Sequence, residues 1–571
     1  MESIANFITL LTDFVWGGNW GKQTILPIGP VVVILLGSGV YFMVRLGFRP
    51  IRRFGGAISE VWAGRKGDGD ENKITAWQAL STALSGQVGT GNLAGVATAI
   101  TLGGPGAIFW MWITAIFGMA LAFAESSLAI KFRETDEYGR VNGGPMYYIK
   151  NGLGKSWGWL AVLFCIGTVF SATATGGMVQ ANSITQSVQE SSRQFSGALP
   201  CQLTQPLKSN VRMVAEGTEI AETIPADSLS KVSACELAGA SQDRLVLIEG
   251  AAKDGAIAVS PYASDPASAD QRVMANWIVG LVLAALVFAV IIGGIKSIGS
   301  VAGRIVPIMA IAYVAIAAVV LIMNVAEIPQ AFAKIFAGAF GFDAAAGGFT
   351  GAVIAIAIRA GVDRGLFSNE AGQGSAPIAH AAAQTKNPVK QGEIAMMGVF
   401  IDTIIICTMT ALVILCVSGD FVNSSGEAVK YAYLADGVLE ATAVTNGAYA
   451  AALPFGGWVV TIAIALFAFT TIIGWSYYAE QAVTYLLGEW ATHPIRYIWV
   501  VVIFIGSLTQ VDFIWLLGGL ANASMAVPNL IALLALSSVI IAMHKKNGDP
   551  DTEDGDSIML KGDKASQVPA E

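Results

Sequence analysis

Long apolar stretches alternate with short polar ones along most of the chain. A helix needs about 20 mostly apolar residues to cross a bilayer, and eleven stretches match or approach that length. They comprise residues 26–48, 74–103, 106–132, 157–188, 274–294, 297–323, 349–383, 394–417, 457–487, 494–508 and 513–543. The pattern predicts an all-α polytopic membrane protein with about 11 transmembrane helices.

Polar sequence divides the chain into four parts. The first four stretches lie in residues 1–188, a mostly polar insert of 84 residues occupies 189–272, the other stretches lie in 273–543, and an acidic tail occupies 544–571. The insert is too long for a tight loop, so we expect a small extracytoplasmic domain or a partly ordered flap. The acids of the tail do not have the spacing of a calcium-binding loop, and we expect a solvated tail.

The composition agrees with this pattern. Hydrophobic residues make up 54% of the 571 residues and charged residues 13%, whereas soluble domains carry about 25% charged residues. These proportions exclude a disordered chain, a nucleic-acid-binding protein and a typical cytosolic enzyme. The sequence contains no Walker-type loop, no zinc-ligand spacing and no nucleophile-elbow motif. We therefore expect neither enzymatic activity nor an organic cofactor.

The distribution of basic residues predicts the orientation in the membrane. With the N-terminus outside, the inner loops and helix ends hold 19 Lys and Arg residues, and the outer ones hold only Lys22, Lys334 and Lys430, the insert aside. Basic residues favour the cytoplasmic side. An odd number of spans then places the C-terminus in the cytoplasm.

The five cysteines fall into two groups. Cys165, Cys407 and Cys416 lie in apolar stretches, where we expect packing residues. Cys201 and Cys235 lie in the insert. In an oxidising compartment these two form a possible disulfide, the alternative being two free thiols.

Two stretches contain glycines and polar residues where lipid favours an uninterrupted helix. They are residues 81–95, with Gly86, Gly89 and Gly91, and residues 363–377. Unwound backbone at membrane depth is tolerated only where it lines a cavity or is buried in protein. Its freed amides and carbonyls can bind a carboxylate or a cation. The alternative is a glycine face that packs closely against another helix.

The positions of the two stretches favour unwound backbone. If residues 26–48 form an extra helix, the breaks fall in the first and sixth of ten core helices. Corresponding positions in two halves are typical of an inverted-repeat transporter that binds its substrate between the repeats. The topology therefore predicts a five-plus-five inverted repeat.

Ionisable residues inside apolar stretches are costly and mark candidate functional sites. The seven are Glu125, Arg359, Asp363, Arg364, Glu370, Asp402 and Glu480. Arg359, Asp363 and Arg364 are close in sequence and can pair with one another. They are gating candidates, or they fix the packing of their helix. Glu370 is a candidate for orienting unwound backbone, and Asp402 and Glu480 are proton-site candidates or structural acceptors. We expect His380, near a helix end, to be exposed.

Four motifs in a fixed order resemble the alanine or glycine:cation symporter family. They are residues 89–97 (GTGNLAGVA), 142–149 (NGGPMYYI), 365–377 (GLFSNEAGQGSAP) and 470–478 (TTIIGWSYY). The resemblance covers the chain apart from the insert and the tail. The motif at 142–149 also reads as a turn followed by interfacial aromatic residues. Since it lies on the predicted cytoplasmic side, we do not expect it to contact substrate.

The resemblance implies the five-plus-five fold of the bacterial leucine transporter, in the amino acid–polyamine–cation superfamily, with core helices 1 and 6 broken. It implies sodium-coupled symport of alanine or glycine by alternating access across a bacterial-type inner membrane, with Na⁺ as the coupling ion. One methyl group changes binding in an apolar pocket by only about 1–3 kcal/mol. The preference between alanine and glycine, and between L and D substrates, therefore stays open. The sequence does not decide the oligomeric state either.

The motifs also imply a substrate site. A buried zwitterion needs donors for its carboxylate and acceptors for its ammonium group, which we expect at the first and second break respectively. The residues carried over are Thr90, Gly91, Asn92, Gln180, Phe367, Ser368, Asn369, Gly372, Thr471 and Trp475. The rings of Phe367 and Trp475 either limit the substrate side chain to hydrogen or methyl or are ordinary core packing.

Na⁺ requires hard oxygen donors. The resemblance implies an ion site between the first and eighth core helices, with carbonyls near Ser85 and Val88 and the hydroxyls of Thr470 and Thr471. A proton-coupled amino acid transporter and a nutrient sensor that uses the insert are the alternatives. A channel is disfavoured because both breaks resemble closed binding sites rather than rings of ligands.

Overall fold

Helices dominate the computed structural model of this chain. The structure describes residues 2–546 apart from 21–22, 27, 68–72, 138, 196–210, 216–217, 225–245, 253–254, 260–265, 342–349, 420, 423–427, 435–440 and 510. Within these residues, eight helical segments are long and apolar enough to cross a membrane. They are Ala107–Lys131, Lys155–Gln189, Met274–Ile291, Gly294–Met323, Pro388–Cys416, Gly456–Leu487, Glu489–Leu508 and Gly518–Ala535. The all-α polytopic architecture is confirmed, whereas eleven crossings and the inverted repeat stay predictions.

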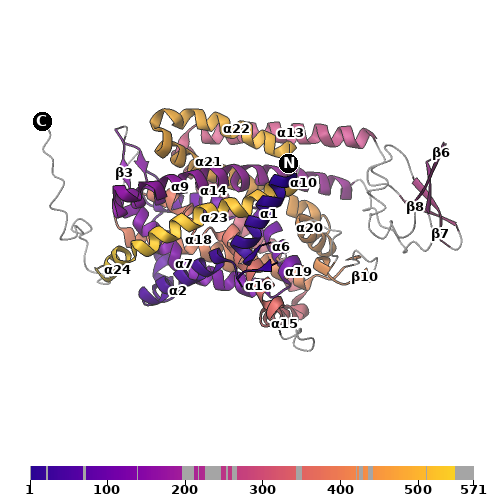
Figure 1. The fold of residues 1–571 in the computed structure, drawn as a ribbon, viewed down its shortest axis with the longest axis horizontal. Helices are drawn as coiled ribbons and strands as arrows, with labels where there is room; N and C mark the ends of the chain where they lie inside the picture. Colours follow the sequence, from indigo (N-terminus) through magenta and orange to yellow (C-terminus); the bar gives the residue numbers. More distant parts are fainter. Residues whose placement is uncertain are drawn as a thin grey trace.

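These segments contain the long helices of Figure 1. They are α7 (Ala107–Lys131), α9 (Gly158–Ser171), α10 (Val179–Phe195), α13 (Pro266–Ile291), α14 (Gly294–Met323), α18 (Pro388–Val399), α19 (Thr408–Cys416), α21 (Gly456–Leu487), α22 (Thr492–Leu508) and α23 (Val511–Ala535). Helices α13 and α22 pack side by side along one edge of the bundle. On α14, Ile308, Ile311 and Ile322 are exposed, as expected for a helix that faces lipid.

The other three predicted stretches are not among these eight segments. One contains α2 (Pro30–Arg45), one contains α5 (Ala76–Gln87), the 3-10 turn η1 (Thr90–Asn92) and α6 (Ala94–Gly103), and one contains α16 (Thr350–Asn369) and α17 (Ala376–Ala381). The last two stretches are therefore interrupted where the glycines and polar residues gather. His380, expected at the surface, is instead buried, because α17 packs between α5 and α7.

Two of the long segments contain π-helical turns. The turn η4 (Ala172–Met178) joins α9 to α10, and η7 (Phe400–Cys407) joins α18 to α19. A π turn often marks a functional site. Here η4 packs against α21, and η7 packs against η1 and α16, so η7 adjoins both broken helices.

The remaining elements are short or peripheral. The helices are α1 (Glu2–Gly17), α3 (Arg49–Arg52), α4 (Phe54–Ala63), α8 (Pro145–Tyr148), η2 (Ile149–Leu153), η3 (Lys155–Trp157), η5 (Val325–Glu327), α15 (Ile328–Ala339), η8 (Ala432–Leu434), α20 (Ala441–Ala452), η9 (Glu489–Ala491) and α24 (Ser537–Lys546). Two-residue strands form the pairs β1 (Asn19–Trp20) with β2 (Gln23–Thr24), β3 (Glu134–Thr135) with β4 (Val141–Asn142), and β9 (Phe421–Val422) with β10 (Ala428–Val429).

Four strands of the insert form an antiparallel sheet in the order β6-β5-β7-β8. They are β5 (Val211–Ala215), β6 (Thr218–Ile224), β7 (Val246–Ala252) and β8 (Gly255–Val259). Cys201 and Cys235 lie outside the described residues, as do residues 547–571 of the tail. Their disulfide, the solvated tail and the domain boundaries stay predictions.

Candidate functional site

The first core helix is interrupted after Gln87. Val88 has an extended backbone, with φ −77° and ψ 91°, and the chain then passes through Gly89 into the turn η1. The backbone amide of Gly89 donates to Oδ1 of Asn92 over 2.8 Å. This bond satisfies a donor at the start of the turn η1, where backbone amides have no intrahelical partner.

Glycine allows the first break to lie against two other helices. A Cβ atom on Gly89 would lie 2.5 Å from Oγ1 of Thr471 in α21, and one on Gly91 would lie 3.0 Å from Cδ1 of Phe367 in α16. Real Cβ atoms hardly ever approach a neighbour as closely as the first of these distances. The backbone of the first break therefore packs directly against the side chains of Thr471 and Phe367, which leaves no room for a side chain at Gly89.

The second break connects α16 to α17 through residues 370–375. Three of these residues have positive φ, namely Glu370 (57°), Gly372 (83°) and Gly374 (88°). Glycine adopts these angles freely. A glutamate in this region carries strain of about 1–3 kcal/mol, which persists mainly at functional sites.

A buried polar network joins the two breaks. Nε2 of Gln87 donates to the carbonyl oxygen of Asn369 over 2.8 Å. Nδ2 of Asn92 donates to Oδ1 of Asp402 over 2.6 Å, and Oγ of Ser368 donates to Oδ2 of the same carboxylate over 2.7 Å. Asp402, in the π turn η7, thus binds a side chain from each break.

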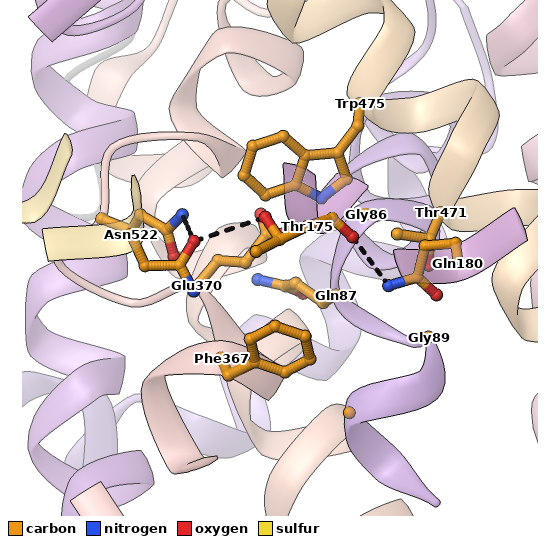
Figure 2. Close-up of a pocket in the computed structure, with 12 residues that line it drawn as sticks. Gly86, Gln87, Gly89, Thr175, Gln180, Phe367, Glu370, Thr471, Trp475 and Asn522 are labelled. Carbon is orange, nitrogen blue, oxygen red and sulfur yellow. Dashed lines mark hydrogen bonds between the residues drawn. The ribbon is translucent and has the colours of Figure 1, made fainter. Parts of the chain in front are cut away.

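A small pocket lies between the breaks (Figure 2). Its free volume of about 10 Å³ is close to that of one ordered water. It is lined by Gly86, Gln87, Gly89, Gly91, Thr175, Gln180, Phe367, Glu370, Gln373, Thr471, Trp475 and Asn522. In Figure 2 the rings of Trp475 and Phe367 lie on opposite sides of Gln87. The pocket therefore has aromatic walls and a polar rim.

Glu370 supplies the charge among these lining residues. Its Oε2 accepts a hydrogen bond from Oγ of Ser375 over 2.6 Å. Its Oε1 is buried and accepts no hydrogen bond of normal geometry, and the indole of Trp475 lies close enough to interact with the carboxylate. Among the residues that the structure describes, no Lys or Arg forms an ion pair with it. The free oxygen can accept a cationic group, which would offset the cost of burying the carboxylate.

A second set of polar contacts holds Gln180 at the other end of the pocket. Its Nε2 donates to the carbonyl oxygen of Thr175 over 3.0 Å, and its Oε1 accepts the backbone amide of Thr90 over 3.2 Å. Gln180 thereby ties the π turn η4 to the first break.

The structure places the ten predicted substrate residues in two layers. Gly91, Gln180, Phe367, Thr471 and Trp475 line the pocket. Thr90, Asn92, Ser368, Asn369 and Gly372 lie behind it, in the two breaks and their hydrogen-bond network. The second layer supports the backbone that forms the pocket.

Two of the four predicted sodium residues lie together. Oγ1 of Thr471 donates to the carbonyl oxygen of Val88 over 3.3 Å. Ser85, one turn earlier on α5, packs against Gly474 of α21. Both threonine hydroxyls also contact the carbonyl oxygen of Phe467, Thr470 over 2.9 Å and Thr471 over 3.0 Å. Thr470 has a different environment because its Oγ1 lies 3.6 Å from Sδ of Met309 in α14.

The three gating candidates make two ion pairs. Arg359 of α16 binds Asp13 of α1, with Nη2 and Oδ1 2.6 Å apart, and both side chains are about one-third exposed. Nη2 of Arg364 lies 3.5 Å from Oδ2 of the adjacent Asp363. The pair between residues 13 and 359 connects the N-terminal helix to the second broken helix.

Glu480, a proton-site candidate, is held in a bidentate ion pair. Nε and Nη2 of Arg496 donate to its two carboxylate oxygens over 2.7 Å and 2.9 Å. Such a pair is typical of a structural role.

Comparison with known proteins identifies the family. The model of the sodium:alanine symporter family matches residues 2–205 and 251–557. The chain belongs to this family. A sodium/alanine symporter of Methanococcus maripaludis is 37% identical over 545 residues, which span 95% of this chain and 96% of that protein. The family match omits residues 206–250, which lie in the insert.

Other relatives share this breadth. The amino-acid carrier protein AlsT of Bacillus subtilis is 34% identical over 95% of this chain and 92% of its own length. GlnT of the same organism, a probable sodium/glutamine symporter, is 33% identical over 90% of this chain and 87% of its own length. Membership in the sodium:alanine symporter family supports amino acid:cation symport by a multi-pass membrane protein.

The sequence assigned no substrate contact to several residues that line the pocket of this family member, although Glu370 was a candidate for orienting the backbone. Glu370 and Gln373 lie in the recognised motif of the second break, and Gln87 lies in the first, so their polarity at membrane depth was an available signal. Thr175 and Asn522 lie in apolar stretches outside the four motifs, and only the packing of α23 against η4 brings them together.

Proposed function

We propose that this chain couples the entry of Na⁺ to the entry of a small neutral amino acid, alanine or glycine, by alternating access. The N-terminus lies outside and the C-terminus in the cytoplasm. The proposal rests mainly on Glu370, a buried carboxylate with a free oxygen on the wall of a small pocket between two helix breaks.

Glu370 receives the substrate ammonium group in this account. Beside a cationic group Glu370 is ionised, so its Oε1 shares the negative charge of the carboxylate, and Ser375 holds the other oxygen in place. Gln373 adds a second buried oxygen, Oε1, that accepts no hydrogen bond. An ammonium group has three donors and no acceptor, so these two oxygens are suitable partners.

The first break receives the substrate carboxylate. Gly91 brings the backbone of η1 to the pocket wall, and backbone amides at the start of a helical turn favour an anion. In this conformation the pocket has room for about one water, so it must widen to admit the substrate. The rings of Trp475 and Phe367 on its walls then limit the substrate side chain to hydrogen or methyl.

The Na⁺ ion binds where the first break meets α21. The carbonyl oxygen of Val88 and Oγ1 of Thr471 are already 3.3 Å apart, and both are hard oxygen donors of the kind that Na⁺ takes. Because the same backbone segment lines the substrate pocket, an ion here would stabilise the substrate-binding form of the break. The bidentate pair of Glu480 with Arg496 favours Na⁺ over proton coupling through Glu480.

Binding of labelled alanine to purified protein in Na⁺ buffer tests the proposal. We expect Glu370→Gln to weaken binding by about tenfold or more, since a charge-assisted hydrogen bond contributes about 1.5–3 kcal/mol. Glu327→Gln is the matched control, because Glu327 is about one-third exposed, pairs with Lys430 and lies outside the pocket. Propionate, which lacks the ammonium group, should compete poorly with alanine.

Wild-type affinity in Glu370→Gln would overturn the placement of the ammonium group. A nutrient sensor is distinguished by deletion of residues 206–250, the part of the insert outside the family match. The symporter core should still transport after this deletion, whereas a sensor that binds its ligand through the insert would lose its response.

A further inference from the structure

Another buried carboxylate lies outside the pocket, on α7. Glu125 is fully buried. Its Oε1 accepts a hydrogen bond from Nδ2 of Asn529 in α23, its Oε2 accepts none of normal geometry, and the backbone amides of Gly372 and Gly374 face the carboxylate. Neutral donors without a counter-ion compensate a carboxylate poorly for the loss of water.

The titratable groups around Glu125 provide no positive charge. Tyr148 of α8 and Glu370 of the second break are its nearest titratable neighbours. On α17, the side chain of His380 is engaged with Gln391 instead. In the described part of the chain, no Lys, Arg or His forms an ion pair with Glu125. The group therefore differs from Glu480, which has Arg496.

Asn529 connects Glu125 to the second break. Its Nδ2 also donates to the carbonyl oxygen of Gly372 over 2.9 Å. Gly374, two residues later, is packed so tightly that a Cβ atom would lie 2.9 Å from Cγ of Asn529 and 2.7 Å from Cγ of Pro145. Movement of the break would therefore change the surroundings of Glu125.

The same contacts give a role to the motif at residues 142–149. Tyr148 donates its hydroxyl to Oδ1 of Asn529, and Pro145 packs on Gly374. The motif thus holds Asn529 and the second break from one side, at a distance from the substrate pocket. Its aromatic residue acts through Asn529 on the buried carboxylate.

We propose that Glu125 is a proton-binding site, occupied in the conformation seen here and emptied when the second break moves. In this conformation the carboxyl group of Glu125 lies among Asn529 and the break residues Gly372 and Gly374. When the break moves, water enters, so the proton leaves to water and the ionised form is stabilised by hydrogen bonds from water and Asn529. The coupling to movement rests on the proposed transport function, whereas the proton itself does not.

Infrared difference spectroscopy on the full-length protein in lipid tests the proton directly. The spectrum of wild type minus Glu125→Gln should contain the C=O stretch of a protonated carboxylic acid. Adding Na⁺ and alanine should change the amplitude of that band. Bands of an ionised carboxylate alone would overturn the site, and an amplitude that ligands leave unchanged would overturn the release of the proton.

The folding of Glu125→Gln and two further variants serve as controls for the infrared experiment. Glutamine is a neutral isostere of the protonated acid, so Glu125→Gln should unfold at nearly the wild-type temperature. Glu480→Gln should remove only bands of an ionised carboxylate. If Glu125→Gln does not fold, Tyr148→Phe provides the second route, because loss of its contact to Asn529 should shift the frequency of the protonated band. An unshifted band in Tyr148→Phe would overturn the role given to the motif.

Measurements of alanine uptake at different pH values distinguish failure of this proposal from failure of the proposed function. Na⁺-driven alanine uptake by wild type should change by about threefold or more between acidic and alkaline pH, and Glu125→Gln should flatten that dependence. Equal pH profiles in the two proteins would overturn proton release during transport. Loss of Na⁺ dependence in wild type would instead contradict the proposed function and leave the infrared result intact.

Discussion

Nε2 of Gln87 donates a hydrogen bond to the carbonyl oxygen of Asn369 over 2.8 Å. The two residues are the last of α5 and α16, so the bond joins the ends of the two broken helices directly. A carbonyl at a helix end has no intrahelical partner. Gln87 thereby replaces the helical bond that the second break removes, and each break depends on the other.

Gln87→Leu should therefore destabilise the protein. It leaves the buried carbonyl of Asn369 without this donor, which costs about 1–3 kcal/mol. We expect a lower unfolding temperature and weaker alanine binding, both measured on the same purified sample. An unfolding temperature equal to that of wild type would show that the bond contributes nothing to the fold.

Gly89→Ala should abolish alanine binding, and Gly95→Ala should retain it. A Cβ atom on Gly89 would lie 2.5 Å from Oγ1 of Thr471, whereas one on Gly95 in α6 would meet its nearest atom, Cδ1 of Phe367, at 4.0 Å. Overpacking costs about 1–3 kcal/mol, while alanine gains about 1 kcal/mol over glycine inside a helix. Parallel binding measurements check the pair, and equal losses in both variants would contradict the assigned close approach.

Thr471→Val should raise the Na⁺ concentration needed for half-maximal alanine binding by about tenfold, equivalent to about 1.4 kcal/mol. The variant keeps the shape of the side chain and removes the hydroxyl that lies beside the Val88 carbonyl. Thr470→Val should have a smaller effect, because its hydroxyl lies towards α14. A larger effect at residue 470 would move the ion site to the other face of α21.

The ion pair between Asp13 and Arg359 should influence the transport rate more than stability. Both side chains are about one-third exposed, and exposed pairs contribute about 0–1 kcal/mol. We expect Asp13→Asn to unfold near the wild-type temperature while its rate of alanine uptake changes. Exchange of the charges in the double variant Asp13→Arg, Arg359→Asp should restore the rate. Failure of the exchange would argue against a gating role for the pair itself.

The sequence predicted the long helices and the two breaks because both depend on local composition. Twenty apolar residues suffice to predict a span, and Gly89 with Gly91 or Gly372 with Gly374 suffice to predict unwinding. The surroundings of Glu480 were not predictable in this way, because Arg496 belongs to a different helix. His380 was placed wrongly for the same reason, since its burial depends on how α17 packs.

The candidate site was only partly accessible from sequence. The motifs led to Phe367, Thr471 and Trp475, which line the pocket. They gave no means of separating these residues from Asn92 and Ser368, whose side chains bind Asp402 behind the wall. Neighbours in sequence, such as Phe367 and Ser368, belong to different layers: one lines the pocket and the other lies in the network behind it. The packing of η7 against both breaks determines this division, and the sequence does not show that packing.

Uptake of labelled alanine into proteoliposomes with an imposed Na⁺ gradient tests the central claim most directly. With pH and membrane potential held fixed, uptake should accumulate alanine above its external concentration when the gradient is Na⁺. It should fall to the level of empty liposomes when choline replaces Na⁺. Equal accumulation in the two salts would contradict sodium-coupled symport.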